Sequence, residues 1–178
     1  MRCFIAAWPS EATRLALGQL VRGLENRVPE GRAMQARNLH LTLAFIGELD
    51  PQHAHALAVD CSDLAADRCD WTIDTLGCFS RARVAWAGGL LNEQLAGCAA
   101  RARTRLDERG IPFDHKAFVP HVTLFRDVRR FDCAGPLVDP IPWRSDHVAL
   151  YAAERDERGP IYRRVTAASQ AGALSNHR

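Results

Sequence analysis

The stretch NLHLTLAFIGE, residues 38–48, decides the fold of this chain, because its His-x-Thr-x pattern recurs in PHVTLFR at residues 120–126. Both copies are short and apolar, so each is expected to form a β-strand. On a strand, residues i and i+2 point to the same face. Each copy therefore directs one imidazole and one hydroxyl to one face and its apolar side chains to the other. The four polar residues are His40, Thr42, His121 and Thr123.

These side chains are the groups that acid–base chemistry on a phosphate ester requires. An imidazole has an ordinary pKa near ~6.5, so one ring can deprotonate a nucleophile while the other protonates a leaving oxygen. The hydroxyls of Thr42 and Thr123 would donate hydrogen bonds to the non-bridging oxygens. Arg126 would add a bidentate contact to the same oxygens. The residues alone do not say which histidine is the acid.

No metal-binding or nucleoside-triphosphate motif accompanies the two copies. The sequence has no HExxH, no paired aspartates at ligand spacing and no Walker loop. We therefore expect chemistry without a metal or other cofactor, on a substrate such as a cyclic phosphate. The six cysteines are scattered without a CxxC pair, which predicts reduced thiols rather than disulfides or metal ligands.

Composition indicates one globular domain. The chain has 178 residues, of which 47% are hydrophobic and 25% charged. The net charge of +2 permits an RNA substrate without requiring one. The N-terminal residues turn polar too early for a signal peptide, and no segment is long enough to span a membrane. We expect a cytoplasmic protein with no membrane partner and no obligate protein partner.

Hydrophobic periodicity predicts an α+β fold. Besides the second motif strand, the expected strands cover residues 2–8, 38–46, 71–78, 82–88, 146–153 and 161–166. Ser10 and Asp50 are expected to cap two helices, and a third helix is expected over residues 91–109 with Leu91 facing inward. Residues 133–142 contain Pro and Gly and predict a loop. The final segment ALSNHR is expected to be frayed.

The two motif histidines lie nearly half the chain length apart, each on an apolar strand with a helical segment before it. This spacing predicts an internal duplication of an α/β unit, with the halves related by an approximate two-fold axis. Such an axis would bring the two His-x-Thr faces together across one groove.

The chain resembles the two-histidine (2H) phosphoesterases, and within them the RNA 2′,3′-cyclic phosphodiesterases, also called 2′-5′ RNA ligases. The resemblance extends over nearly the whole sequence. It is carried by the segments RCFIAAWP, NLHLTLAFIGEL, RARVAWAG, KAFVPHVTLFR and VALYAAE. It implies a bilobal fold in which residues 1–178 form a single domain of two pseudo-symmetric lobes, with two antiparallel sheets flanking a central groove.

The resemblance also implies metal-independent hydrolysis of an RNA terminal 2′,3′-cyclic phosphate to a 2′-phosphate, with 2′-5′ RNA ligase as a side activity. It implies that His40 is the proton donor and His121 the proton acceptor, and that Thr42, Thr123 and Arg126 bind the substrate. The implied partner is RNA with a 2′,3′-cyclic phosphate end, such as a tRNA fragment.

Two alternatives stay open. One is a 2H phosphoesterase that acts on small cyclic nucleotides, an ADP-ribose cyclic phosphate or 2′-5′ oligoadenylate. The other is a non-catalytic module that binds RNA ends. Lys116 and Arg81 are either RNA-facing or ordinary surface charges. The aromatic residues expected mainly in the core, with one or two as a base platform, are Phe4, Trp86, Phe118 and Phe125.

Overall fold

The computed structural model describes residues 1–66, 69–157 and 159–167, so the predicted frayed segment ALSNHR lies outside the described residues. The strands are β1 (Arg2–Pro9), β2 (Arg32–Ala33), β3 (Leu41–Glu48), β4 (Trp71–Phe79), β5 (Val84–Gly88), β6 (His121–Arg126), β7 (Gly135–Trp143), β8 (Ser145–Asp156) and β9 (Gly159–Arg164). The α-helices are α1 (Glu11–Leu24), α2 (Pro51–Asp60) and α3 (Glu93–Glu108), with 3₁₀ turns η1 (Glu25–Arg27), η2 (Ala36–Asn38) and η3 (Asp63–Ala66). The predicted α+β class is confirmed.

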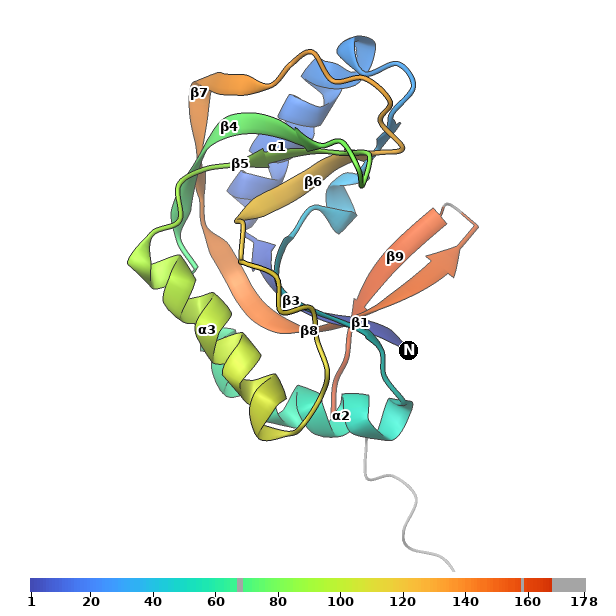
Figure 1. Cartoon of the computed structure of the whole chain (residues 1–178), viewed down its shortest axis with the longest axis vertical. Helices are drawn as coiled ribbons and strands as arrows, with labels where there is room; N and C mark the ends of the chain where they lie inside the picture. Colours follow the sequence, from blue (N-terminus) through green and yellow to red (C-terminus); the bar gives the residue numbers. More distant parts are fainter. Residues whose placement is uncertain (67–68, 158, 168–178) are drawn as a thin grey trace, which may run out of the picture.

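In the described part of the chain the strands form one antiparallel sheet, so the expectation of two separate sheets is wrong. The order is β7-β4-β5-β6-β3-β1-β8-β9, and β2 pairs with β6. The physical reason is a pairing of Leu41 on β3 with Val122 on β6, which joins the halves. From this junction the first half-sheet (β3, β1, β8, β9) and the second half-sheet (β6, β5, β4, β7) diverge (Figure 1).

The strand order reads the same way outward from the β6–β3 junction. On each side the motif strand is followed by a strand from earlier in the chain, β1 for β3 and β5 for β6, and then by two more antiparallel strands. In each half a helix lies between these two strands in the chain, α1 in the first half, where the short β2 intervenes as well, and α3 in the second. We propose on this basis that the chain is a single domain of two pseudo-symmetric lobes.

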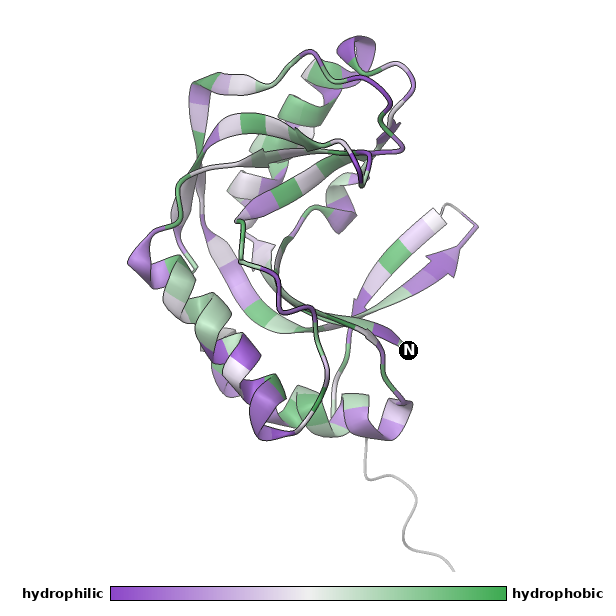
Figure 2. Ribbon diagram, viewed as in Figure 1, coloured by the Kyte–Doolittle hydropathy of each residue, from purple (hydrophilic) through white to green (hydrophobic). Residues whose placement is uncertain are grey.

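Two helices cross between the half-sheets. Helix α1 leaves β1 of the first half-sheet and packs against β7 of the second, where the Thr13 hydroxyl donates to the Pro142 carbonyl at 3.2 Å. Helix α3 leaves β5 of the second half-sheet and packs against β3 of the first (Figure 1). Hydrophobic and hydrophilic residues alternate along these helices, as expected for elements with one buried face (Figure 2). The crossed helices hold the half-sheets together beyond their shared strand contact.

The predicted helix caps are confirmed. The side chain of Ser10 accepts a hydrogen bond from the Thr13 amide, and that of Asp50 accepts one from His53. The inward orientation predicted for Leu91 is wrong. Helix α3 begins only at Glu93, and Leu91 is exposed before it.

The loop predicted over residues 133–142 is wrong, because β7 runs through most of it. This strand contains three prolines and pairs with β4 alone. A proline lacks the amide hydrogen that a central strand needs, but an edge strand leaves one side unpaired and tolerates it. The segment therefore forms a strand despite its prolines, because it lies at the edge of the sheet.

The main hydrophobic core fills one face of the sheet and includes both junction residues, Leu41 and Val122, each fully buried. A smaller apolar cluster lies on the opposite face of the first half-sheet. It consists of Phe4, Ala6, Ala149 and Tyr151, with Trp8 and Tyr162 packed against it. The cysteines are free thiols, four of them buried, as predicted. None of the described helices combines the length and apolar character that crossing a membrane requires.

Gly77 and Gly23 offer a matched test of this packing. A Cβ on Gly77 would lie 2.2 Å from the Trp86 ring that it faces on β5, whereas a Cβ on Gly23 in α1 would meet nothing within 4 Å. We expect Gly77→Ala to lower the free energy of unfolding by about 1–3 kcal/mol through overpacking. We expect Gly23→Ala to raise it by about 0.5–1 kcal/mol through helix propensity. Urea unfolding of both variants measures this, and equal stabilities would contradict the packing described for Trp86.

Candidate active site

The β3–β6 junction gathers the four motif side chains on one face. Because Leu41 and Val122 both turn into the core, their neighbours along each strand turn to the opposite face. The antiparallel register places His40 across from Thr123, and Thr42 across from His121. All four polar side chains are half-buried. Two segments far apart in the sequence thus form one cross-strand group of two imidazoles and two hydroxyls.

Both motif strands contain a β-bulge directly after the threonine. In β3 the pairing with β1 jumps from Thr42 to Ala44 between successive partners, and in β6 the pairing with β5 jumps from Thr123 to Phe125. A bulge inserts one residue and reverses the alternation beyond it. Arg126, three residues after Thr123, consequently faces the same side as the motif. Without the bulge, regular alternation would place the Arg126 side chain on the opposite face of the sheet.

Arg126 and Phe45 occupy equivalent positions in the two copies, each three residues after its threonine. Both line a cavity of about 220 Å³, called here the motif cavity, which is also lined by Arg2, Phe4, His40, Thr42, Ala153 and Tyr162. No described carboxylate forms an ion pair with Arg126. The second copy therefore supplies an uncompensated positive charge where the first supplies an aromatic ring.

Backbone carbonyls orient the two imidazoles in the same way. His40 Nδ1 donates to the Asn38 carbonyl at 2.7 Å, and His121 Nδ1 donates to the Val119 carbonyl at 2.8 Å. This fixes the neutral tautomer with the proton on Nδ1 and leaves each Nε2 as the reactive nitrogen. The Thr42 hydroxyl lies 3.1 Å from His40 Nε2 and donates to it.

The two rings differ in their surroundings. His40 is stacked with Phe4 and Trp8, at ring-centroid distances of 4.9 and 5.5 Å, and meets the edge of Tyr162 at 5.0 Å. His121 meets Phe79 edge-on at 4.9 Å and lies 6.4 Å from Trp86. The aromatic enclosure is therefore tighter around His40.

Burial is the main cause of the pKa shifts of both histidines. It lowers the pKa of His40 to about 4, with the charges of Arg126 and His121 adding to the effect and the bond to the Asn38 carbonyl opposing it. The pKa of His121 is also lowered by burial and by Arg126, against the bond to Val119. Both rings are thus neutral at pH 7. The charge effects also show that Arg126 and both imidazoles share one electrostatic environment.

Known proteins resemble this chain in sequence and in fold. The model of the LigT-like phosphoesterase family matches residues 8–86. The chain is 28% identical over 180 residues to the RNA 2′,3′-cyclic phosphodiesterase of Thermotoga maritima, covering 92% of each protein. The crystal structure of Escherichia coli LigT complexed with 3′-AMP matches with a TM-score of 0.77 and 27% identity, over 92% of this chain and 94% of that one.

In sequence and in fold this chain resembles the LigT-like phosphoesterases of the 2H family. A second relative, the RNA 2′,3′-cyclic phosphodiesterase of Escherichia coli K12, is 36% identical over 103 residues, which cover 54% of this chain and 56% of that protein. The family resemblance inferred from the tandem motif is confirmed.

The other residues singled out in the sequence lie at different places in the structure. Lys116 is exposed and paired with Asp114, and Arg81 is exposed in the β4–β5 turn. Phe125 is buried in the core, and the partly buried Phe118 packs against that core. Phe4 and Trp86 instead face the two motif rings.

Sequence reasoning missed several cavity residues, among them Arg2, Phe45 and Tyr162. Arg2 could have been found, because period-two alternation along β1 places it on the same face as Phe4. The guanidinium of Arg2 lies over the Phe45 ring, 5.1 Å from its centroid. Within residues 1–66, 69–157 and 159–167, no three His, Cys, Asp or Glu side chains are grouped to hold a metal ion.

The lowered pKa of His40 predicts an acid-sensitive fold. Below an unfolded-state pKa near 6.5 the unfolded chain binds a proton that the native ring takes up only near pH 4. The unfolding free energy therefore falls as the pH drops through this window and is unaffected by His40 above it. We expect His40→Gln to reduce the loss between pH 6.5 and 4 by about 2 kcal/mol, after allowance for solvent screening.

Urea unfolding at several pH values measures this effect. The same substitution at the exposed His115 controls for the loss of an imidazole elsewhere in the chain. An unchanged pH dependence in His40→Gln would show that the ring is not desolvated in the native state.

Proposed function

We propose that this LigT-like phosphoesterase hydrolyses RNA terminal 2′,3′-cyclic phosphates to 2′-phosphates. One observation carries the proposal: two imidazole–hydroxyl pairs and Arg126, which no carboxylate of the described residues neutralises, face the same side of one strand junction. The named relatives from Thermotoga maritima and Escherichia coli are RNA 2′,3′-cyclic phosphodiesterases. Solved structures of the Escherichia coli protein with 3′-AMP and with phosphate support a nucleotide phosphate as the ligand.

In the proposed reaction His121 is the base. Its Nε2 takes a proton from water, and the water oxygen forms the new bond to phosphorus. The bond from phosphorus to the 3′ oxygen breaks, and His40 Nε2 delivers a proton to that oxygen. The product is a 2′-phosphate with a free 3′ hydroxyl, and the two histidines have exchanged protonation states.

Thr42, Thr123 and Arg126 would hold the phosphoryl oxygens. Each hydroxyl lies across the strand pair from the other copy's histidine, which suits a phosphate placed between the rings. The guanidinium can make two parallel hydrogen bonds to a phosphoryl group. Charge that develops on the non-bridging oxygens would be stabilised in a partly dry environment, where such contacts are strongest.

The acid must be protonated, although burial lowers the pKa of His40 to about 4. A bound phosphodiester carries a negative charge, which offsets Arg126 and gives the imidazolium an acceptor. Both effects raise the pKa of His40 toward neutrality. The proposed acid therefore charges only when the substrate anion is bound.

The remaining expectations stay predictions. They are independence from metal ions, a 2′-5′ RNA ligase side activity, a cytoplasmic location, and RNA partners such as tRNA fragments. A small cyclic nucleotide or 2′-5′ oligoadenylate as substrate, and non-catalytic RNA-end binding, remain the alternatives that the experiments below distinguish.

Single replacement of either motif histidine tests the catalytic assignment. We expect His40→Ala and His121→Ala each to lower kcat by about 10²–10⁴-fold, because each removes one proton transfer. The double variant should lose much less than the product of the two effects, since the rings act as one unit. His55→Ala, at a half-buried histidine in α2, is the matched control. Circular dichroism checks folding, and substantial turnover by either motif variant would contradict the assignment.

Product analysis tests the reaction and its direction. We expect an RNA with a 2′,3′-cyclic end to yield a 2′-phosphate, with the same rate in the presence of EDTA. The two isomeric products are separated chromatographically against synthetic standards. A 3′-phosphate product would reverse the proposed leaving group, and binding without turnover would favour the RNA-end binding module.

A further inference from the structure

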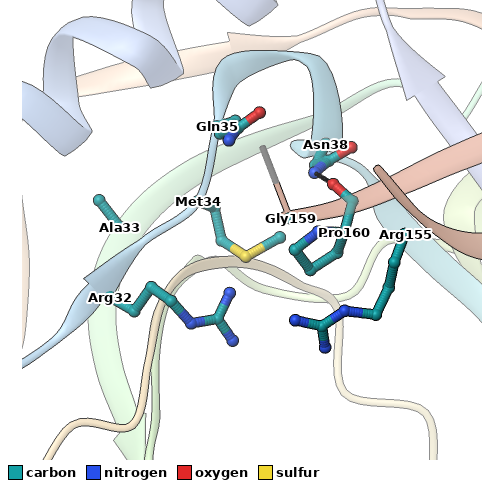
Figure 3. Close-up of a pocket in the computed structure, with 8 residues that line it drawn as sticks. All are labelled: Arg32, Ala33, Met34, Gln35, Asn38, Arg155, Gly159 and Pro160. Carbon is teal, nitrogen blue, oxygen red and sulfur yellow. Dashed lines mark hydrogen bonds between the residues drawn. The ribbon is translucent and has the colours of Figure 1, made fainter. Parts of the chain in front are cut away.

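A second cavity lies beside the motif cavity, and half of the residues that line it are polar or basic. It measures about 380 Å³ and is called here the hairpin cavity, because the β8–β9 hairpin forms one wall and β2 with η2 forms the other. Its lining includes Arg32, Gln35 and Asn38 on one side, and Arg155 and Pro160 on the other. Figure 3 shows the guanidinium groups of Arg32 and Arg155 facing one another across it.

We propose that the hairpin cavity binds the next phosphate of an RNA strand, one nucleotide before the cyclic end. The inference rests on the proposed function and extends it, because it makes an oligonucleotide rather than a mononucleotide the preferred substrate. The ligand class is a phosphodiester anion held between two guanidinium groups.

The β8–β9 hairpin connects the two cavities. Ala153 and Tyr162 pair across the hairpin and line the motif cavity, while Arg155 and Pro160 pair two residues further out and line the hairpin cavity. Residues i and i+2 share a face, so one side of the hairpin lines both cavities. The step along it is about 7 Å, a length comparable with the spacing of successive phosphates.

On the opposite wall, two neighbouring arginines connect the motif cavity to the hairpin cavity. Arg32 on β2 pairs directly with Arg126 on β6, so the two lie side by side in the sheet. Arg126 lines the motif cavity and Arg32 lines the hairpin cavity. A strand whose terminal phosphate contacts Arg126 would therefore meet Arg32 next.

The charges in the hairpin cavity are suited to an anion. Two like charges that face each other repel, and a bound anion removes that cost. No described carboxylate forms an ion pair with Arg155. Among the described residues, Arg32 forms an ion pair with Asp127, through Nε at 3.3 Å, and its terminal nitrogens are left for a ligand.

Asn38 links this cavity to the chemistry. Its side-chain amide donates to the Pro160 carbonyl at 2.7 Å and holds the hairpin against η2, while its own carbonyl orients His40. An anion that draws the two walls together would shift Asn38, and through the Asn38 carbonyl it would affect the orientation of the His40 ring. A second phosphate can therefore contribute to turnover as well as to binding.

The test compares two substrates that end in the same nucleoside 2′,3′-cyclic phosphate: the cyclic mononucleotide of adenosine, and the dinucleotide ApA with a cyclic end. We expect Arg155→Ala and Arg32→Ala each to lower kcat/KM for the dinucleotide about tenfold and to leave the mononucleotide unchanged. Arg155→Lys should restore part of the loss. Arg163→Ala removes the same charge from the neighbouring strand of this hairpin, where Arg163 pairs with Glu154, and should affect neither substrate.

Equal losses on both substrates, or equal effects of Arg155→Ala and Arg163→Ala, would overturn the proposal. A binding measurement separates its failure from failure of the proposed function. For ApA ending in a 2′-phosphate, Arg155→Ala should reduce the slope of log Kd against log salt by about 0.7, with no change for adenosine 2′-phosphate. If the wild type cleaves neither substrate the proposed function fails, and an unchanged slope then overturns the second phosphate site as well.

Discussion

The contact between Leu41 and Val122 is the constraint on which the arrangement of the site depends. It joins the two motif strands, buries one apolar side chain from each, and thereby turns their polar neighbours to the other face. The crossed helices α1 and α3 hold the two half-sheets around this contact. A change that separated β3 from β6 would leave each half with one histidine and one threonine, which cannot flank a phosphate.

The two copies of the His-x-Thr motif, on β3 and β6, have similar backbone features but different surroundings. The same bulge follows each threonine, and the same kind of carbonyl orients each imidazole. The difference lies in what the bulge presents, Phe45 in one copy and Arg126 in the other. Burial, with the positive charge of Arg126 adding to it, lowers the pKa values of both imidazoles. A bound anion would offset the charge of Arg126, so in the proposed reaction the substrate itself would favour protonation of the acid.

Features determined by neighbouring residues were predictable from the sequence. The caps at Ser10 and Asp50 and the strand character of the motifs follow from local chemistry. Features determined by the sheet were not predictable in this way. One is the edge position of β7, at which prolines are tolerated. The other is the pairing of Leu41 with Val122, which joins the two half-sheets into a single sheet. Arg126 lies on the motif face because of the bulge in β6, which the sequence did not predict; regular alternation from Thr123 would place its side chain on the opposite face. Arg155 had no sequence signal, because its role arises only from the cavity opposite Arg32.

A crystal structure with a bound nucleoside 2′-phosphate tests the central claim most directly. The account predicts that Nε2 of both His40 and His121 lies within about 2.7–3.2 Å of oxygens of the same phosphoryl group. Arg126 should contact that group from the β6 side. A phosphate held by only one imidazole, or bound away from the β3–β6 junction, would contradict it.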